Sequence, residues 1–195
     1  TYAQQGFDHF VVATGYKGEV ISEWVSTLNS PWKIAPVDTG LDTQTGGRIK
    51  KCMDLYPGEK ILATYGDGIG NIDVKKLLKF HDSHGRLATL TAVRPPARFG
   101  YLDMKNGQVV HFGEKNQSDA GWINGGFFVI EPEVSDLVKS FDEPFETGAL
   151  PRLVSTGNLM SFHHDGFWQP MDTLREKQEL AKFAATKNPP WLSGI

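Results

Sequence analysis

The chain has 195 residues, of which 39% are hydrophobic and 22% are charged, so it can bury a substantial core and is not intrinsically disordered. Its 20 basic and 23 acidic residues give a net charge of −3 without a dense Lys/Arg block, which argues against nucleic acid as a partner. A single cysteine excludes an intrachain disulfide. The sequence shows no long apolar run and no signal peptide, which predicts a cytoplasmic protein that does not cross a membrane.

Strand-like and helix-like patterns alternate through the first half of the chain. Val74, Leu77 and Leu78 begin the i, i+3, i+4 spacing of an amphipathic helix, and Gly85 then ends it. This βαβα order favours a parallel or mostly parallel sheet. In chain order, the patterns predict a helix end at 1–5, strands at 10–13, 34–37, 61–65 and 87–93, and helices at 19–27, 47–55 and 73–84.

The second half adds strands that are joined by turns. We expect strands at 101–104, 109–112 and 122–130, helical runs at 132–140 and 149–155, a strand at 159–163 and a closing helix at 173–185. The whole chain, 1–195, is therefore predicted to be a single α/β domain with a mixed, mostly parallel sheet and added antiparallel strands.

Asp67 is the most informative residue, because it stands between two glycines directly after the apolar strand at 61–65. Ligands of open α/β sheets bind at the carboxyl ends of strands, and flanking glycines let a ligand approach the backbone. A carboxylate alone would repel a phosphate, so the arrangement predicts that Asp67 holds a divalent cation that in turn holds phosphates. A simple turn remains an alternative, since Gly and Asp are common turn residues.

The same loop can also be interpreted as a dinucleotide-binding turn between a strand and a helix. Asn71 stands where the third glycine of that fingerprint is expected, and Asp67 would face the pyrophosphate without a cation.

Asp172 is the second carboxylate of interest, because it precedes the closing helix. It could cap that helix. However, Thr173 and Glu176 form a Thr-x-x-Glu capping box, which leaves Asp172 available for another role. Two carboxylates far apart in sequence, each at a strand-to-helix junction, suit a Mg²⁺ site for phosphate chemistry.

Two further polar segments could bind a ligand. Thr45, Gly46, Gly47 and Arg48 lead into a helix and could offer backbone N–H groups and a positive charge to a phosphate or base, or could form a flexible connection. The pair Glu114–Lys115 and the run Asn124–Gly126 lie at strand ends, where they could bind sugar hydroxyls or form a solvated hairpin.

Taken together, these motifs resemble the sugar-1-phosphate nucleotidylyltransferases. The runs Thr45–Arg48 and Thr64–Gly68 are similar to that superfamily. The runs at 88–93, 98–100, 123–128 and 166–175 are similar to its glucose-1-phosphate cytidylyltransferase branch. The resemblance implies a Rossmann-like nucleotidyltransferase domain that makes CDP-glucose from CTP and glucose 1-phosphate for lipopolysaccharide O-antigen biosynthesis.

The resemblance also implies a role for each matching residue. It makes Asp67 and Asp172 the two Mg²⁺ ligands, and it makes the chain a homo-oligomer. It assigns catalysis to Asp67, Lys115 and Asp172, nucleotide binding to Thr45, Gly46, Gly47, Arg48 and Gly66, and sugar-phosphate binding to Gly100, Glu114, Lys115, Asn124 and Gly125.

The chain departs from the family pattern in three places. It contains no Gly-Gly-x-Gly-Thr-Arg loop and no Lys-Pro motif after such a loop, its segment 24–34 is short, and Asn116 stands where the family has Pro. We therefore expect an N-terminally truncated and inactive form of the enzyme. Two alternatives are a non-catalytic sugar-nucleotide-binding or regulatory subunit and a metal-dependent glycosyltransferase.

Overall fold

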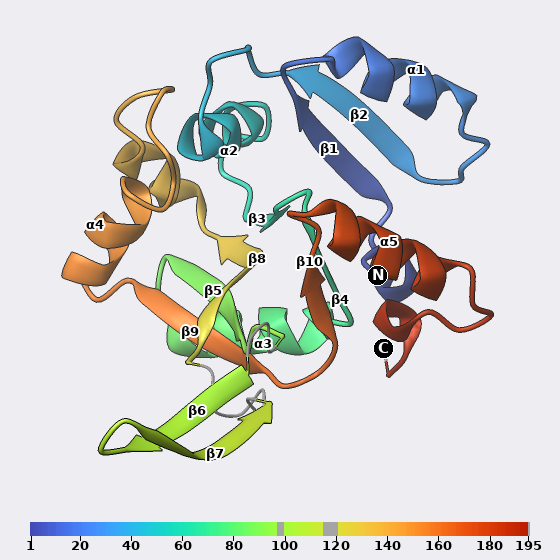
Figure 1. Cartoon of the computed structure of the whole chain (residues 1–195). Helices are drawn as coiled ribbons and strands as arrows, with labels where there is room; N and C mark the ends of the chain where they lie inside the picture. Colours follow the sequence, from blue (N-terminus) through green and yellow to red (C-terminus); the bar gives the residue numbers. More distant parts are fainter. Residues whose placement is uncertain (97–99, 115–120, 195) are drawn as a thin grey trace.

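A computed structural model describes residues 1–96, 100–114 and 121–194 (Figure 1). Its central sheet has four strands in the order β3, β8, β5, β9. Strand β8 runs antiparallel to both β3 and β5, whereas β5 and β9 are parallel, so three of the four strands share one direction. This confirms the expected mixed sheet. The strands are β3 (Ile61–Thr64), β5 (Ala88–Val93), β8 (Ile123–Ile130) and β9 (Leu159–His164).

Three two-stranded sheets accompany the central one. The first is parallel and lies at the opposite end of the molecule from the third, which is an antiparallel hairpin (Figure 1). The second, also antiparallel, joins two three-residue strands that the sequence did not predict. The pairs are β1 (His9–Thr14) with β2 (Lys33–Asp38), β4 (Gly68–Gly70) with β10 (Trp168–Pro170), and β6 (Gly100–Lys105) with β7 (Gln108–Glu114).

The helices lie close to the ranges that the sequence predicts. One correction concerns 132–140, where the structure has a 3₁₀ helix that ends at residue 137. Among the described residues, no helix is both long and apolar enough to cross a membrane. The α-helices are α1 (Gly18–Thr27), α2 (Thr45–Asp54), α3 (Val74–His84), α4 (Ala149–Ser155) and α5 (Leu174–Ala184), and the 3₁₀ helices are η1 (Ala3–Gln5), η3 (Pro132–Leu137) and η4 (Pro190–Leu192).

Strand β8 is the centre of the hydrophobic core, because both faces of the sheet are covered there. Phe128 and Ile130 pack into one cluster with residues of α2, η3 and α4, such as Leu153. Phe127 and Val129 point to the other face and pack into a second cluster that contains Leu77 of α3. The alternation follows from the two-residue period of a strand. Only the start of β8, at Ile123 and Asn124, lies outside the buried core. The candidate site is built around this end of the strand.

Helix α1 is the exception, since none of its residues is buried. Val20 and Trp24, which the sequence places on one apolar face, are 53% and 55% exposed. This helix lies beside β2 at the edge of the molecule (Figure 1).

Candidate active site

The short ribbon of β4 and β10 brings Asp67 and Asp172 to the same end of one structure. Gly68 pairs with Pro170 in antiparallel register, so the residue before β4 lies beside the residues that follow β10. The Met171 N–H donates to the carbonyl oxygen of Asp67 at 2.7 Å. Both aspartates are exposed. The backbones of Asp67 and Asp172, which are 105 positions apart in the numbering, therefore lie close together.

Asp172 is not the residue that caps α5. Thr173 is the N-cap, and its hydroxyl accepts a hydrogen bond from the Glu176 N–H at 3.2 Å. The Glu176 carboxylate in turn accepts from the backbone N–H groups of Asp172 and Thr173, each at 2.9 Å. The predicted capping box is thus confirmed, and capping does not account for the Asp172 carboxylate.

The donor set at this ribbon suits a hard cation. Mg²⁺ is usually bound by one or two carboxylates and completes its shell with water and substrate phosphates. Within 1–96, 100–114 and 121–194, no group of three or more His, Cys, Asp or Glu side chains could enclose a metal ion. A pair of exposed carboxylates therefore fits an ion that shares its coordination with a substrate better than a fully enclosed structural metal.

A cavity of about 400 Å³ opens beside Asp67. Its wall is the backbone of Gly66–Ile69 on one side and helix α5 with Met171 and Trp191 on the other. Apart from Asp67 and Lys177, the side chains that line it are apolar. A low-polarity wall around a few charged groups is the usual composition of a small-molecule site.

The Gly66–Asn71 segment does not have the geometry of a dinucleotide-binding turn. It forms β4 rather than opening a helix, and α3 begins only at Val74. A Cβ at Gly70 would lie 3.0 Å from the Phe167 carbonyl oxygen, so this glycine serves close packing against the β10 region.

The glycines at the start of α2 also face protein rather than solvent. Gly46 and Gly47 are buried, and a Cβ at Gly47 would lie 2.1 Å from the carbonyl oxygen of Phe141. The Arg48 guanidinium donates to the Thr14 carbonyl oxygen at 2.7 Å and to the Thr39 hydroxyl, at the ends of β1 and β2. The structure thus does not bring Gly46, Gly47 and Arg48 to the cavity beside Asp67, and these residues stay a prediction for nucleotide binding.

Asn124 and Gly125 lie close to the Asp67 loop. A Cβ at Gly68 would lie 3.6 Å from the Gly125 carbonyl oxygen, which accepts a hydrogen bond from Trp168 Nε1 at 2.9 Å. The Asn124 side-chain oxygen accepts from the Gly126 N–H at 2.9 Å. The predicted sugar-side residues of β8 are therefore adjacent to the predicted metal-side residues.

The hairpin of β6 and β7 carries the other predicted sugar-side positions. Gly100 pairs with Glu114 across the hairpin, whereas Lys115 lies outside the described residues.

Glu146 is a residue that the sequence did not point to. Its carboxylate accepts hydrogen bonds from the Thr45 hydroxyl, at 2.8 Å, and from the Tyr65 hydroxyl. The pKa of Tyr65 lies well above its usual value, mainly because the side chain is buried. The hydrogen bond and charge of Glu146 and the charge of Asp67 raise this pKa further. Because Glu146 lies in a loop 101 residues from Thr45, no spacing in the sequence could have indicated this contact.

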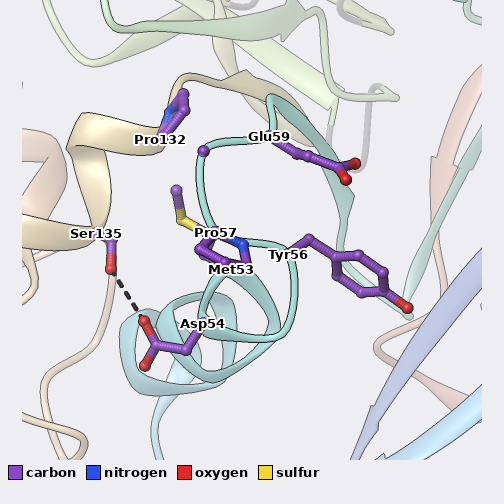
Figure 2. A pocket seen from close by; sticks show the side chains of 8 residues that line it. Met53, Asp54, Tyr56, Pro57, Glu59, Pro132 and Ser135 are labelled. Atoms are coloured by element: carbon purple, nitrogen blue, oxygen red, sulfur yellow. Dashed lines mark hydrogen bonds between the residues drawn. The ribbon is translucent and has the colours of Figure 1, made fainter.

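A second, smaller cavity of about 160 Å³ lies between the α2–β3 loop and η3 (Figure 2). Figure 2 shows Ser135 donating a hydrogen bond to Asp54, at 3.4 Å. None of the predicted site residues lines this cavity.

Curated proteins of similar sequence cover nearly the whole chain. The glucose-1-phosphate cytidylyltransferase of Salmonella typhimurium is 40% identical over 213 residues, which cover 97% of the chain and 83% of the relative. The probable glucose-1-phosphate cytidylyltransferase of Bacillus subtilis is 37% identical over 203 residues, which cover 93% and 80%. No protein-family model matches the chain.

Solved structures support the fold. HddC from Yersinia pseudotuberculosis superposes with a TM-score of 0.72 at 20% identity, over 93% of this chain and 80% of that protein. The inositol-1-phosphate CTP transferase from T. maritima superposes with a TM-score of 0.59 at 16% identity, over 89% and 74%. The Rossmann-like nucleotidyltransferase fold is thus confirmed. With 40% identity across nearly its whole length, the chain belongs to the glucose-1-phosphate cytidylyltransferase family of nucleotidyltransferases.

Proposed function

We propose that the chain makes CDP-glucose and pyrophosphate from CTP and glucose 1-phosphate, with Mg²⁺ as the cofactor. The observation that carries this proposal is the meeting of Asp67 and Asp172 at one end of the β4–β10 ribbon, beside a cavity, in a chain of this family. Its products suit nucleotide-sugar and O-antigen biosynthesis in the cytoplasm, and the enzyme acts as a homo-oligomer.

Asp67 and Asp172 would hold the Mg²⁺ ion. When bound, the ion neutralises charge on the phosphates of CTP. The task of the two carboxylates is to hold and orient the ion.

The reaction needs no covalent intermediate with the protein. A phosphate oxygen of glucose 1-phosphate attacks the α-phosphorus of CTP, a new P–O bond forms, and the bond to the leaving pyrophosphate breaks in line. Catalysis then consists of positioning and charge stabilisation. We assign nucleotide binding to Thr45, Gly46, Gly47, Arg48 and Gly66, sugar-phosphate binding to Gly100, Glu114, Asn124 and Gly125, and charge stabilisation of the transferred group to Lys115.

The test is pyrophosphate release from CTP and glucose 1-phosphate by the chain and by its Asp67→Asn and Asp172→Asn variants. Each variant keeps the shape of the side chain and loses its charge, so we expect a loss of about 10²-fold or more in turnover. Asp142→Asn is the matched control, because this exposed carboxylate accepts a hydrogen bond from the Ser140 hydroxyl and lies in the loop before α4.

The two alternatives give different results in the same assay. A non-catalytic sugar-nucleotide-binding subunit would bind CDP-glucose without releasing pyrophosphate under any condition. A metal-dependent glycosyltransferase would consume a nucleotide sugar rather than CTP.

A further inference from the structure

The Glu146 side chain connects two segments that the proposed function assigns to the same substrate. One carboxylate oxygen, Oε2, accepts from Thr45 Oγ1 at 2.8 Å, and the other, Oε1, accepts from the Tyr65 hydroxyl. Thr45 is the first residue of α2, and Tyr65 is the first residue after β3. A single side chain therefore fixes the start of a helix against the end of a strand.

The Thr45 end of this connection is held from both sides. The Thr45 hydroxyl donates to Glu146 and accepts a hydrogen bond from the Phe145 N–H at 2.8 Å. Gly46 is buried, and a Cβ there would lie 2.6 Å from the carbonyl oxygen of Glu143, so the glycine lets this loop lie directly on α2. A carboxylate at a helix N-terminus is also favoured by the helix dipole.

The Tyr65 end leads directly to Asp67. The Tyr65 N–H donates to the Gly126 carbonyl oxygen at 2.9 Å, and its ring packs on Phe128 with centroids 5.4 Å apart. Gly66 has open space around it, since a Cβ there would meet nothing within 4 Å. Asp67 is thus held on one side by its own carbonyl bond to Met171 and the pairing of Gly68 with Pro170, and on the other by its link through Gly66 to Tyr65.

We infer that Glu146 is a positioning residue, which through its two hydrogen bonds sets Asp67 relative to the start of α2. This inference rests on the proposed function, because it is there that Asp67 serves the metal-bound nucleotide and Thr45 the nucleotide itself. Glu146 does not touch the reacting atoms. Its effect passes through Tyr65 to the carboxylate two residues further on.

The Tyr65 hydroxyl donates its proton to the Glu146 carboxylate in this bond. A glutamine at position 146 could accept from Tyr65 through its oxygen and donate to Thr45 through its nitrogen. It would preserve both hydrogen bonds while removing the charge.

The test compares Glu146→Ala, Glu146→Gln and Tyr65→Phe with the unaltered chain, and uses Asp142→Ala as the control for a carboxylate lost from the same loop. Calorimetry measures the dissociation constant of Mg·CTP. Hydrogen exchange measures the amides of residues 65–68 without any ligand. We expect Glu146→Ala and Tyr65→Phe to weaken Mg·CTP binding about tenfold and to speed exchange at 65–68, because each removes a hydrogen bond to a charged group.

Rescue by the conservative variant separates positioning from charge. Glu146→Gln should bind Mg·CTP within about threefold of the unaltered chain, and Asp142→Ala should match it. If Glu146→Gln is as weak as Glu146→Ala, charge rather than positioning explains the effect and the inference is wrong. Wild-type affinity in Glu146→Ala or Tyr65→Phe would overturn it equally.

Failure of the proposed function would look different. An unaltered chain that does not bind Mg·CTP would refute the function, and the exchange data would still judge Glu146. Faster exchange at 65–68 in Glu146→Ala and Tyr65→Phe, but not in Asp142→Ala, supports the positioning role, and unchanged exchange refutes it. If Glu146→Ala does not fold, Tyr65→Phe decides, because it keeps the aromatic ring on Phe128.

Discussion

Asp73 and Thr173 cap α3 and α5, and the sequence predicted the capping role of Thr173 but not that of Asp73. Asp73 accepts from the Lys76 N–H at 2.9 Å, and its second oxygen pairs with the Lys76 ammonium at 2.9 Å. The hydrogen bonds and charge of Lys76 hold the pKa of Asp73 below its usual value. Spacing alone thus predicted the cap of α5.

Asp73 should therefore stabilise the fold in a pH-dependent way. Since its pKa is lower in the folded state than in the unfolded chain, its contribution is present above the unfolded pKa and is lost as the pH falls through the folded value. Asp73→Ala should cost about 1 kcal/mol at pH 7. Urea unfolding at pH 7 and pH 3 measures this cost, and a difference between variant and wild type that does not shrink at pH 3 would contradict the charge argument.

At the scale of elements, the glycine pair at the start of α2 determines how closely the segment before α4 can approach. A Cβ at Gly47 would lie 2.1 Å from the carbonyl oxygen of Phe141 and 2.7 Å from its Cα. Backbone atoms cannot rotate away as a side chain would. Helix and segment must therefore separate when a methyl group is added.

Gly47→Ala is accordingly expected to destabilise the fold by about 3 kcal/mol, the upper range for overpacking. Gly121→Ala is the matched control, because a Cβ there meets nothing within 4 Å, and it should change stability by less than about 0.5 kcal/mol. Thermal and urea unfolding of both variants check this. Equal stability of the two would show that the Phe141 segment adapts at little cost.

Helices with a clear hydrophobic period were predictable from the sequence. Very short strands and contacts between segments far apart in the chain were harder to predict. Helix α4 was predicted with its observed bounds, and α3 and α5 within a residue or two at each end. The ribbon of β4 and β10 was missed, because a three-residue strand that contains two glycines has no hydrophobic period to detect. The meeting of Asp67 with Asp172 was predicted from motifs, but the Glu146 contacts depend on tertiary structure alone.

At the scale of the whole molecule, the sheets leave strand edges without a partner. Among the described residues, β1 pairs only with β2 and β3 only with β8. Unpaired edges of this kind invite association with other strands.

The position of β8 between two cores also has a kinetic consequence. Its partners β3 and β5 both precede β8 in the chain, and Ile61 pairs with Ile130. Strand β9 comes after β8 and α4 in the chain and pairs with β5, as Ala88 with Leu159. Each of these pairings closes a long loop before it gains a contact, so the loop entropy must be overcome first. We therefore expect both cores to become ordered late in folding, in the step in which β8 enters the sheet.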